Sequence, residues 1–170
     1  MTMNTNRDNF RAWYSKVLDG LYSDQNAGFV ILMISFPLLE RYLREKSSVH
    51  EGKLNASFYS ELQRIFPVIT TQETAKQFWQ VYRNGLLHQV TLSLKNKKGI
   101  QMPAGWLHQD VDLLKIDGSG NFWVHPAKFA KIVIEVIEND FETFEGQHSD
   151  SHPLPRVHPT ILGTSSTDLK

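Results

Sequence analysis

Apolar side chains recur every three or four residues along most of this chain, and no other feature of the sequence limits its fold as strongly. A period near 3.6 residues places such side chains on one face of a helix, and that face has to be buried. The pattern predicts helices over residues 9–22, 27–46, 56–66, 70–88 and 126–146. We therefore predict a mainly α fold, a bundle of four to five helices, in which residues 1–146 form one domain.

Two local sequence features add detail to the predicted helices, one on the course of the second helix and one on the start of the fourth. Pro37 lies inside the second helix, where the missing N–H and the ring predict a kink or a break. Thr70 and Glu73 have the spacing of a capping box, which predicts that the fourth helix begins there.

Between the fourth and the last predicted helix, apolar residues recur at every second position, as they do in β-strands. Residues 90–94 alternate between apolar and polar, and a lysine-rich turn follows at 95–99. Residues 113–117 and 121–125 flank Gly118-Ser119-Gly120, which is typical of a second hairpin. We expect a small β-hairpin insert around 90–125, before the last helix. Residues 147–170 have no aromatic side chain and are rich in Ser, Thr and Pro, so we expect a disordered tail.

Charge and cysteine content exclude several classes of protein. The chain has 170 residues, no cysteine, and 18 basic against 18 acidic side chains. Disulfide scaffolds, thiol nucleophiles and cysteine zinc sites are therefore excluded. Residues 47–100 carry seven basic and three acidic side chains, whereas residues 101–146 carry three and eight. Neutrality argues against a protein that holds nucleic acid by bulk charge, but a local basic groove is compatible with it.

No segment has the pattern of a targeting or membrane-spanning sequence. The first ten residues lack an apolar run after a basic start. The longest apolar stretch, residues 27–39, is about 13 residues long, whereas a transmembrane helix needs about 20. We expect a cytoplasmic protein without a membrane partner.

The fourth helix ends on Arg83-Asn84-Gly85-Leu86-Leu87-His88, an R-N-x-x-x-H motif. In this motif and in the order of its helices the chain resembles the HEPN superfamily, small helical bundles in which an R-x(4–6)-H motif forms a ribonuclease site. The resemblance implies metal-independent endoribonuclease activity without a cofactor, in which the RNA 2′-hydroxyl attacks and a cyclic phosphate remains. It also implies a role in toxin or defence systems, where an antitoxin is a possible partner, and a homodimer whose two motifs line one cleft.

The residue types of the motif suit this chemistry. His88 has a side chain that titrates near neutrality and can accept or donate the proton that moves in the reaction. Arg83 offers a planar fork of donors to a phosphate, and Asn84 can orient the histidine or bind a phosphate oxygen. On an α-helix Arg83 lies about 140° from His88, so the two meet one phosphate only through a long arginine side chain or across a dimer.

Three more residues are expected to support the motif. Glu40 falls on the apolar side of the second helix and needs a partner there. It either holds Arg83 or tunes His88 from the second helix, or it pairs with Arg44 one turn on, or Pro37 rotates the helix and leaves Glu40 at the surface. Gln80 shares the polar stripe of the motif, and Tyr82 directly precedes Arg83.

The β insert contains further candidates for RNA contact. The turn lysines Lys95, Lys97 and Lys98 either guide an RNA backbone or form a solvated tip. The aromatic residues Trp106 and Trp123, with His125, either stack on bases or belong to the core. We expect no metal site, since the tail histidines have neither cysteine nor carboxylate partners.

The alternative from another class is a non-enzymatic module. In that hypothesis the HEPN-like bundle presents a polar groove to a single-stranded RNA, a nucleotide or a protein partner, and the motif serves binding or dimerisation.

Overall fold

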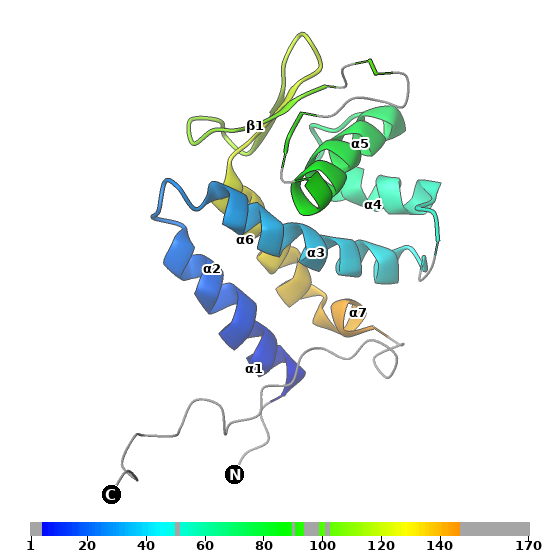
Figure 1. The fold of residues 1–170 in the computed structure, drawn as a ribbon. Helices are drawn as coiled ribbons and strands as arrows, with labels where there is room; N and C mark the ends of the chain where they lie inside the picture. Colours follow the sequence, from blue (N-terminus) through cyan, green and yellow to red (C-terminus); the bar gives the residue numbers. More distant parts are fainter. Residues whose placement is uncertain (1–4, 50–51, 90, 94–98, 101–102, 147–170) are drawn as a thin grey trace, which may run out of the picture.

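The protein is mainly helical and carries a small three-stranded sheet (Figure 1). A computed structural model describes residues 5–49, 52–89, 91–93, 99–100 and 103–146. The predicted tail, the three turn lysines and both ends of the first predicted hairpin strand lie outside these residues. In chain order the elements are α1 (Asn6–Phe10), η1 (Arg11–Ser15), α2 (Lys16–Leu21), α3 (Gly28–Lys46), α4 (Ala56–Ile65), α5 (Gln72–Trp79), η2 (Gln80–Gln89), β1 (Gly105–Leu107), β2 (Leu114–Ile116), β3 (Phe122–Val124), α6 (Pro126–Asn139) and α7 (Phe141–Glu145).

The first predicted helix is present and begins earlier than expected. Thr5 caps α1 by accepting a hydrogen bond from the backbone of Asp8, while the Asp8 side chain accepts one from the Thr5 backbone. This capping box starts the helix at Asn6 rather than at residue 9. Helical structure then continues through η1, a π-helical segment, into α2.

Pro37 does not break the second helix. Helix α3 runs from Gly28 to Lys46 with Pro37 inside it. An internal proline costs about 3 kcal/mol, but the buried side chains of Phe36, Leu38 and Leu39 flank it. Each buried side chain of this size contributes about 1.5–3 kcal/mol, which outweighs the proline penalty.

The fourth predicted helix begins one residue later than the predicted capping box. Thr71, not Thr70, is the N-cap of α5, and its side chain accepts a hydrogen bond from the backbone of Thr74 at 3.1 Å. The helix also changes type along its length. From Gln80 onward it is π-helical and forms η2, which carries the R-N-x-x-x-H motif.

The last predicted helix is divided at Asp140. Its backbone leaves the helical region there, with φ −136°, and separates α6 from α7. The Asp140 carboxylate accepts hydrogen bonds from Tyr42 and Lys46 of α3 and from Thr143 of α7. These bonds lower its pKa, in opposition to its partial burial, and hold the break against α3.

The sheet agrees with the prediction only in part. Strands β2 and β3 form the antiparallel hairpin expected around Gly118–Gly120. The third strand, β1, was not predicted and pairs parallel to β3, which gives the order β1-β3-β2. Residues 91–93 of the first predicted hairpin are not in a strand; the Leu92 carbonyl instead accepts a hydrogen bond from the Gly105 backbone at 2.7 Å.

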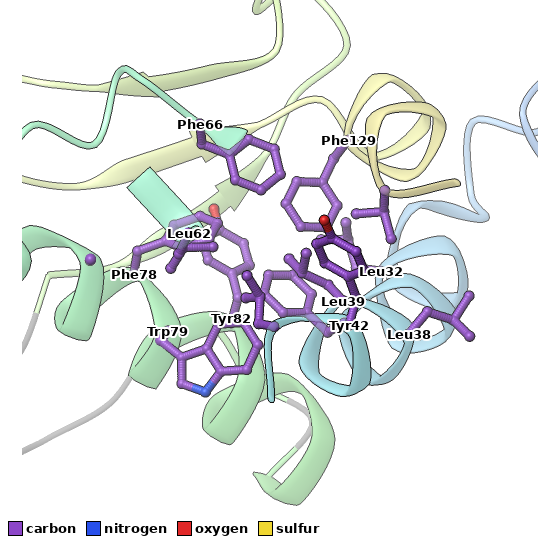
Figure 2. Close-up of a cluster of buried hydrophobic side chains, with 14 of the residues drawn as sticks. Leu32, Leu38, Leu39, Tyr42, Leu62, Phe66, Phe78, Trp79, Tyr82 and Phe129 are labelled. Carbon is purple, nitrogen blue, oxygen red and sulfur yellow. The ribbon is translucent and has the colours of Figure 1, made fainter. Parts of the chain in front are cut away.

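Helix α3 lies at the centre of the bundle and packs against α6, α7, α4 and η2. The core between them is largely aromatic (Figure 2). Phe36 stacks on Phe129 of α6 and on Tyr82 of η2, with ring centroids 4.9 and 5.7 Å apart. Phe129 also stacks on Phe66, at 5.0 Å. No helix among the described segments is long and apolar enough to cross a membrane.

Candidate functional site

Arg83 of η2 reaches across to Glu40 of α3. Its Nε donates to one carboxylate oxygen at 2.7 Å, and its Nη2 donates to the other at 3.3 Å. The Glu40 side chain is 13% exposed and that of Arg83 27%. The expected partnership is therefore present, as a two-point contact that fixes the plane of the guanidinium.

The same carboxylate also binds Arg44. The Arg44 Nε donates to Glu40 at 3.0 Å, one helical turn further along α3. Glu40 thus accepts hydrogen bonds from both of its predicted partners, Arg83 and Arg44, at the same time. The Glu40 carboxylate therefore lies between two guanidinium groups in a partly buried place.

The π-helical form of η2 changes the relation between the two ends of the motif. In an α-helix, residues five apart lie about 140° from each other around the axis. Hydrogen bonds of a π-helix run between residues five apart, so such residues lie about one turn from each other. Positions 83 and 88 both belong to η2, which places them on one face. The side chain of His88 lies outside what the structure describes.

Asn84 lies beside the guanidinium. Its side-chain oxygen accepts a hydrogen bond from Arg83 Nη1 at 3.4 Å. Both side chains are partly exposed, so Asn84 completes a small polar surface at the start of the motif.

The two expected supporting residues of η2 have different positions. Gln80 is exposed, in keeping with a polar stripe. Tyr82 is fully buried in the core, and its hydroxyl contacts the carbonyls of Trp106 and Phe122 at 3.0 Å and the Trp106 N–H at 3.1 Å. Burial raises the pKa of this phenol far above its usual range. Tyr82 joins η2 to the sheet and does not face the Arg83–Glu40 pair as a polar group.

The aromatic residues of the insert divide between two places. Trp106 and Trp123 lie on the outer face of the sheet, whereas Phe122 and Val124 are buried beneath it. Of the two alternatives left open for the tryptophans, a place in the core is wrong for Trp106, which is 49% exposed. His125 is the N-cap of α6, and its Nδ1 accepts a hydrogen bond from the backbone of Lys128.

A cleft of about 680 Å³ lies at the other end of α3, and sequence reasoning missed it. It is formed where the loop after α2, the end of β1 and the start of α6 meet, and Tyr22, Phe29, His108 and His125 are among its lining residues. Gly28 lies in its wall, 12 residues before Glu40, or about 18 Å along the helix. The cleft is thus separate from the Arg83 site.

No group of three or more carboxylate and histidine side chains that could hold a metal ion occurs within the described part of the chain. No protein-family model matches this chain, and neither a curated protein nor a solved structure shows significant similarity to it.

Proposed function

We propose that this protein is a metal-independent endoribonuclease of the HEPN type, with Arg83, Asn84 and His88 as its catalytic residues. The observation that carries the proposal is the two-point contact between Arg83 and Glu40, in a helix whose π-helical repeat brings position 88 to the face of position 83. Cleavage through the 2′-hydroxyl requires a group that transfers protons, for which a histidine is suited, and a positioned cation, for which a guanidinium is suited.

In the proposed reaction, the 2′-oxygen of a ribose forms a bond to the adjacent phosphorus while the bond from phosphorus to the 5′-oxygen breaks. His88 takes the proton from the 2′-hydroxyl or gives a proton to the leaving 5′-oxygen, and a water molecule makes the other of these two proton transfers. Arg83 stabilises the negative charge that develops on the phosphoryl oxygens, and Glu40 keeps its guanidinium in place. The products are a 2′,3′-cyclic phosphate and a free 5′-hydroxyl.

The surface of α3 supports a homodimer around this site. Val30, Met33 and Pro37 are exposed on α3. Met33 precedes Glu40 by seven residues, or about two turns, so this stripe of exposed residues leads directly to Glu40. A second copy that covers the stripe would lie beside the Arg83–Glu40 pair, and the motifs of two protomers would then line one groove.

The test is cleavage of a single-stranded RNA by the purified protein in EDTA. We expect cleavage by the wild type, and a loss of at least 100-fold in His88→Ala and in Arg83→Ala. Arg64→Ala is the matched control, since Arg64 makes a comparable ion pair with Glu61 on the surface of α4. Intact RNA after incubation with folded wild-type protein would overturn the proposal.

A specific observation also favours a second candidate, a non-catalytic binding module. Glu40 binds Arg44 as well as Arg83, and such a network stabilises a bundle whether or not RNA is cleaved. If the network is only structural, Arg83→Ala lowers stability while the wild type leaves RNA intact. Cytoplasmic expression separates the candidates too, because a ribonuclease should slow growth and Arg83→Ala should relieve this, whereas a module should not.

A further inference from the structure

The outer face of the sheet carries a row of three side chains at paired positions. Trp106 of β1 is paired with Trp123 of β3, and Lys115 of β2 is paired with Trp123 on the other side. Paired residues of neighbouring strands project from the same face. The two indole rings lie 5.4 Å apart between centroids and only 19° from parallel. In Figure 1 this sheet lies at one end of the molecule, above the helices.

The position of Trp123 is fixed by the turn between β2 and β3. Its indole N–H donates to Asp117 at 3.1 Å. The Asp117 carboxylate also accepts from the backbone of Ser119 and Asn121, at 2.9 Å each. These hydrogen bonds lower the pKa of Asp117 to about 2, and the bond from Trp123 has the largest effect. The ring is therefore held in place before any ligand arrives, which reduces the entropy lost on binding.

The dimensions of this face fit a nucleobase. Three strands about 4.8 Å apart, with three residues each at about 3.3 Å per residue, give a face of about 100 Å². A stable protein interface buries about 800 Å² on each side. An area of about 100 Å² matches one or two stacked bases, and every base offers a flat ring to an indole.

Polar groups beside the rings suit the rest of a nucleotide. A hollow of about 280 Å³ next to Trp123 is lined by His108, Asp110, Val111, Lys115 and Trp123. The Lys115 ammonium forms no ion pair within the part of the chain that the structure describes, and its side chain is exposed. It can bind one phosphate. Asp110 lies 3.6 Å from His108 and contributes the opposite charge, so the hollow as a whole is close to neutral.

From these observations we infer that the outer face of the sheet is a base-stacking site for single-stranded RNA, with Trp106 and Trp123 as the platform and Lys115 as a phosphate contact. The site deepens the proposed ribonuclease function and, as a substrate-binding surface, rests on it. Tyr82 connects the two places, because its hydroxyl holds the backbone of Trp106 while the next residue in the chain is Arg83.

The experiment measures binding of a fluorescent single-stranded oligonucleotide in EDTA by full-length protein carrying His88→Ala, so that no cleavage occurs. In this background we expect Trp106→Ala to weaken binding by 5-fold to 100-fold, as the loss of one base stack does. The matched control is Trp13→Ala, since Trp13 is 46% exposed but lies on η1, away from the sheet. It should leave binding unchanged.

Two further comparisons identify the kind of contact. A duplex of the same sequence should bind more weakly, because its bases are already paired and stacked. The logarithm of the binding constant should fall with the logarithm of salt concentration with a slope of about −0.7 per phosphate contact, and Lys115→Ala should remove about one such contact. Equal loss in Trp106→Ala and Trp13→Ala, or unchanged binding in Trp106→Ala, would overturn the inference.

These outcomes are distinguishable from failure of the proposed activity. A wild-type protein that binds through Trp106 but leaves RNA intact refutes the ribonuclease and keeps the stacking site. A wild-type protein that cleaves RNA with the same KM as Trp106→Ala refutes the stacking site and keeps the ribonuclease.

Discussion

At Glu40, one carboxylate accepts hydrogen bonds from two guanidinium groups on two helices. Because all three side chains are partly buried, none of the charges is fully hydrated, and each is stabilised by its neighbours. The network positions Arg83 and at the same time ties η2 to α3. A change at Glu40 therefore acts on stability and on the candidate site together.

Replacing Glu40 by Ala should lower the free energy of unfolding by about 2 kcal/mol, because two partly buried guanidinium groups lose their counter-charge. Urea unfolding monitored by circular dichroism measures this. Glu61→Ala removes an exposed pair with Arg64 and should cost less than about 1 kcal/mol. Equal losses in the two variants would show that the Glu40 network is no more than a surface contact.

Gly105 is a second residue of structural importance, because β1 passes so close to η2 there that a side chain would not fit. A Cβ placed there would lie 2.8 Å from Val81 and 3.0 Å from Tyr82 of η2, both buried. We expect Gly105→Ala to lower the free energy of unfolding by about 1–3 kcal/mol through overpacking. In Gly118→Ala the new methyl group meets nothing within 4 Å, so this variant should stay within about 1 kcal/mol of the wild type. A Gly105→Ala protein as stable as Gly118→Ala would contradict the close contact between β1 and η2.

At the scale of elements, the sequence predicted where the helices lie better than whether each is α-helical or π-helical. Helices α3, α4 and α6 were predictable from the sequence because each has a stripe of apolar residues that forms one buried face. The change from the α-helix α5 to the π-helix η2 was not predictable, since the buried residues Phe78, Tyr82 and Leu86 are spaced by four and fit a π-helical turn as well as an α-helical one. Strand β1 was missed because three residues are too few for an alternating pattern, and its pairing with β3 depends on tertiary contacts.

The start of α6 should depend on pH through its cap. His125 accepts a hydrogen bond from the Lys128 backbone through Nδ1, which requires an unprotonated nitrogen. Burial, with help from Lys128 and Lys131, lowers its pKa in the folded state. The unfolded state therefore takes up the proton first, so the stability from this cap is complete above about pH 6.5 and is lost as the pH falls below it.

The substitution His125→Asn tests this expectation, because asparagine caps helices well and does not titrate in this range. Between pH 7 and pH 5, thermal unfolding should show a smaller drop in Tm for His125→Asn than for the wild type. The difference in free energy should be at most about 1 kcal/mol, the usual value of one cap. Equal drops would show that His125 does not cap α6 as a neutral side chain.

At the scale of the whole molecule, net charge and the proposed homodimer bear on how RNA would reach the candidate site. Neutral net charge predicts that this chain is no bulk binder of nucleic acid. The Glu40–Arg83 pair was predictable from a carboxylate placed among apolar residues. The exposed tryptophan platform was not, because sequence alone does not say which face of a three-stranded sheet is covered.

The proposed homodimer is tested by placing charges on the exposed stripe of α3. We expect the double variant Val30→Asp and Met33→Asp to have the mass of a monomer by light scattering, where the wild type has that of a dimer, and to lose RNA cleavage with it. Val68→Asp, at an exposed apolar residue before α5, is the control and should remain dimeric. A wild type that is monomeric at all concentrations, or a double variant that stays dimeric, would contradict this interface.

The most direct measurement of the central claim is the chemistry of the cut ends. A defined single-stranded RNA is incubated with wild-type protein in EDTA, and the fragments are weighed by mass spectrometry. We expect fragments ending in a 2′,3′-cyclic phosphate paired with fragments that begin with a 5′-hydroxyl, and neither in His88→Ala of unchanged circular dichroism. Fragments with 5′-phosphate ends, equal cleavage by His88→Ala, or uncut RNA would contradict a ribonuclease site built on Arg83 and His88.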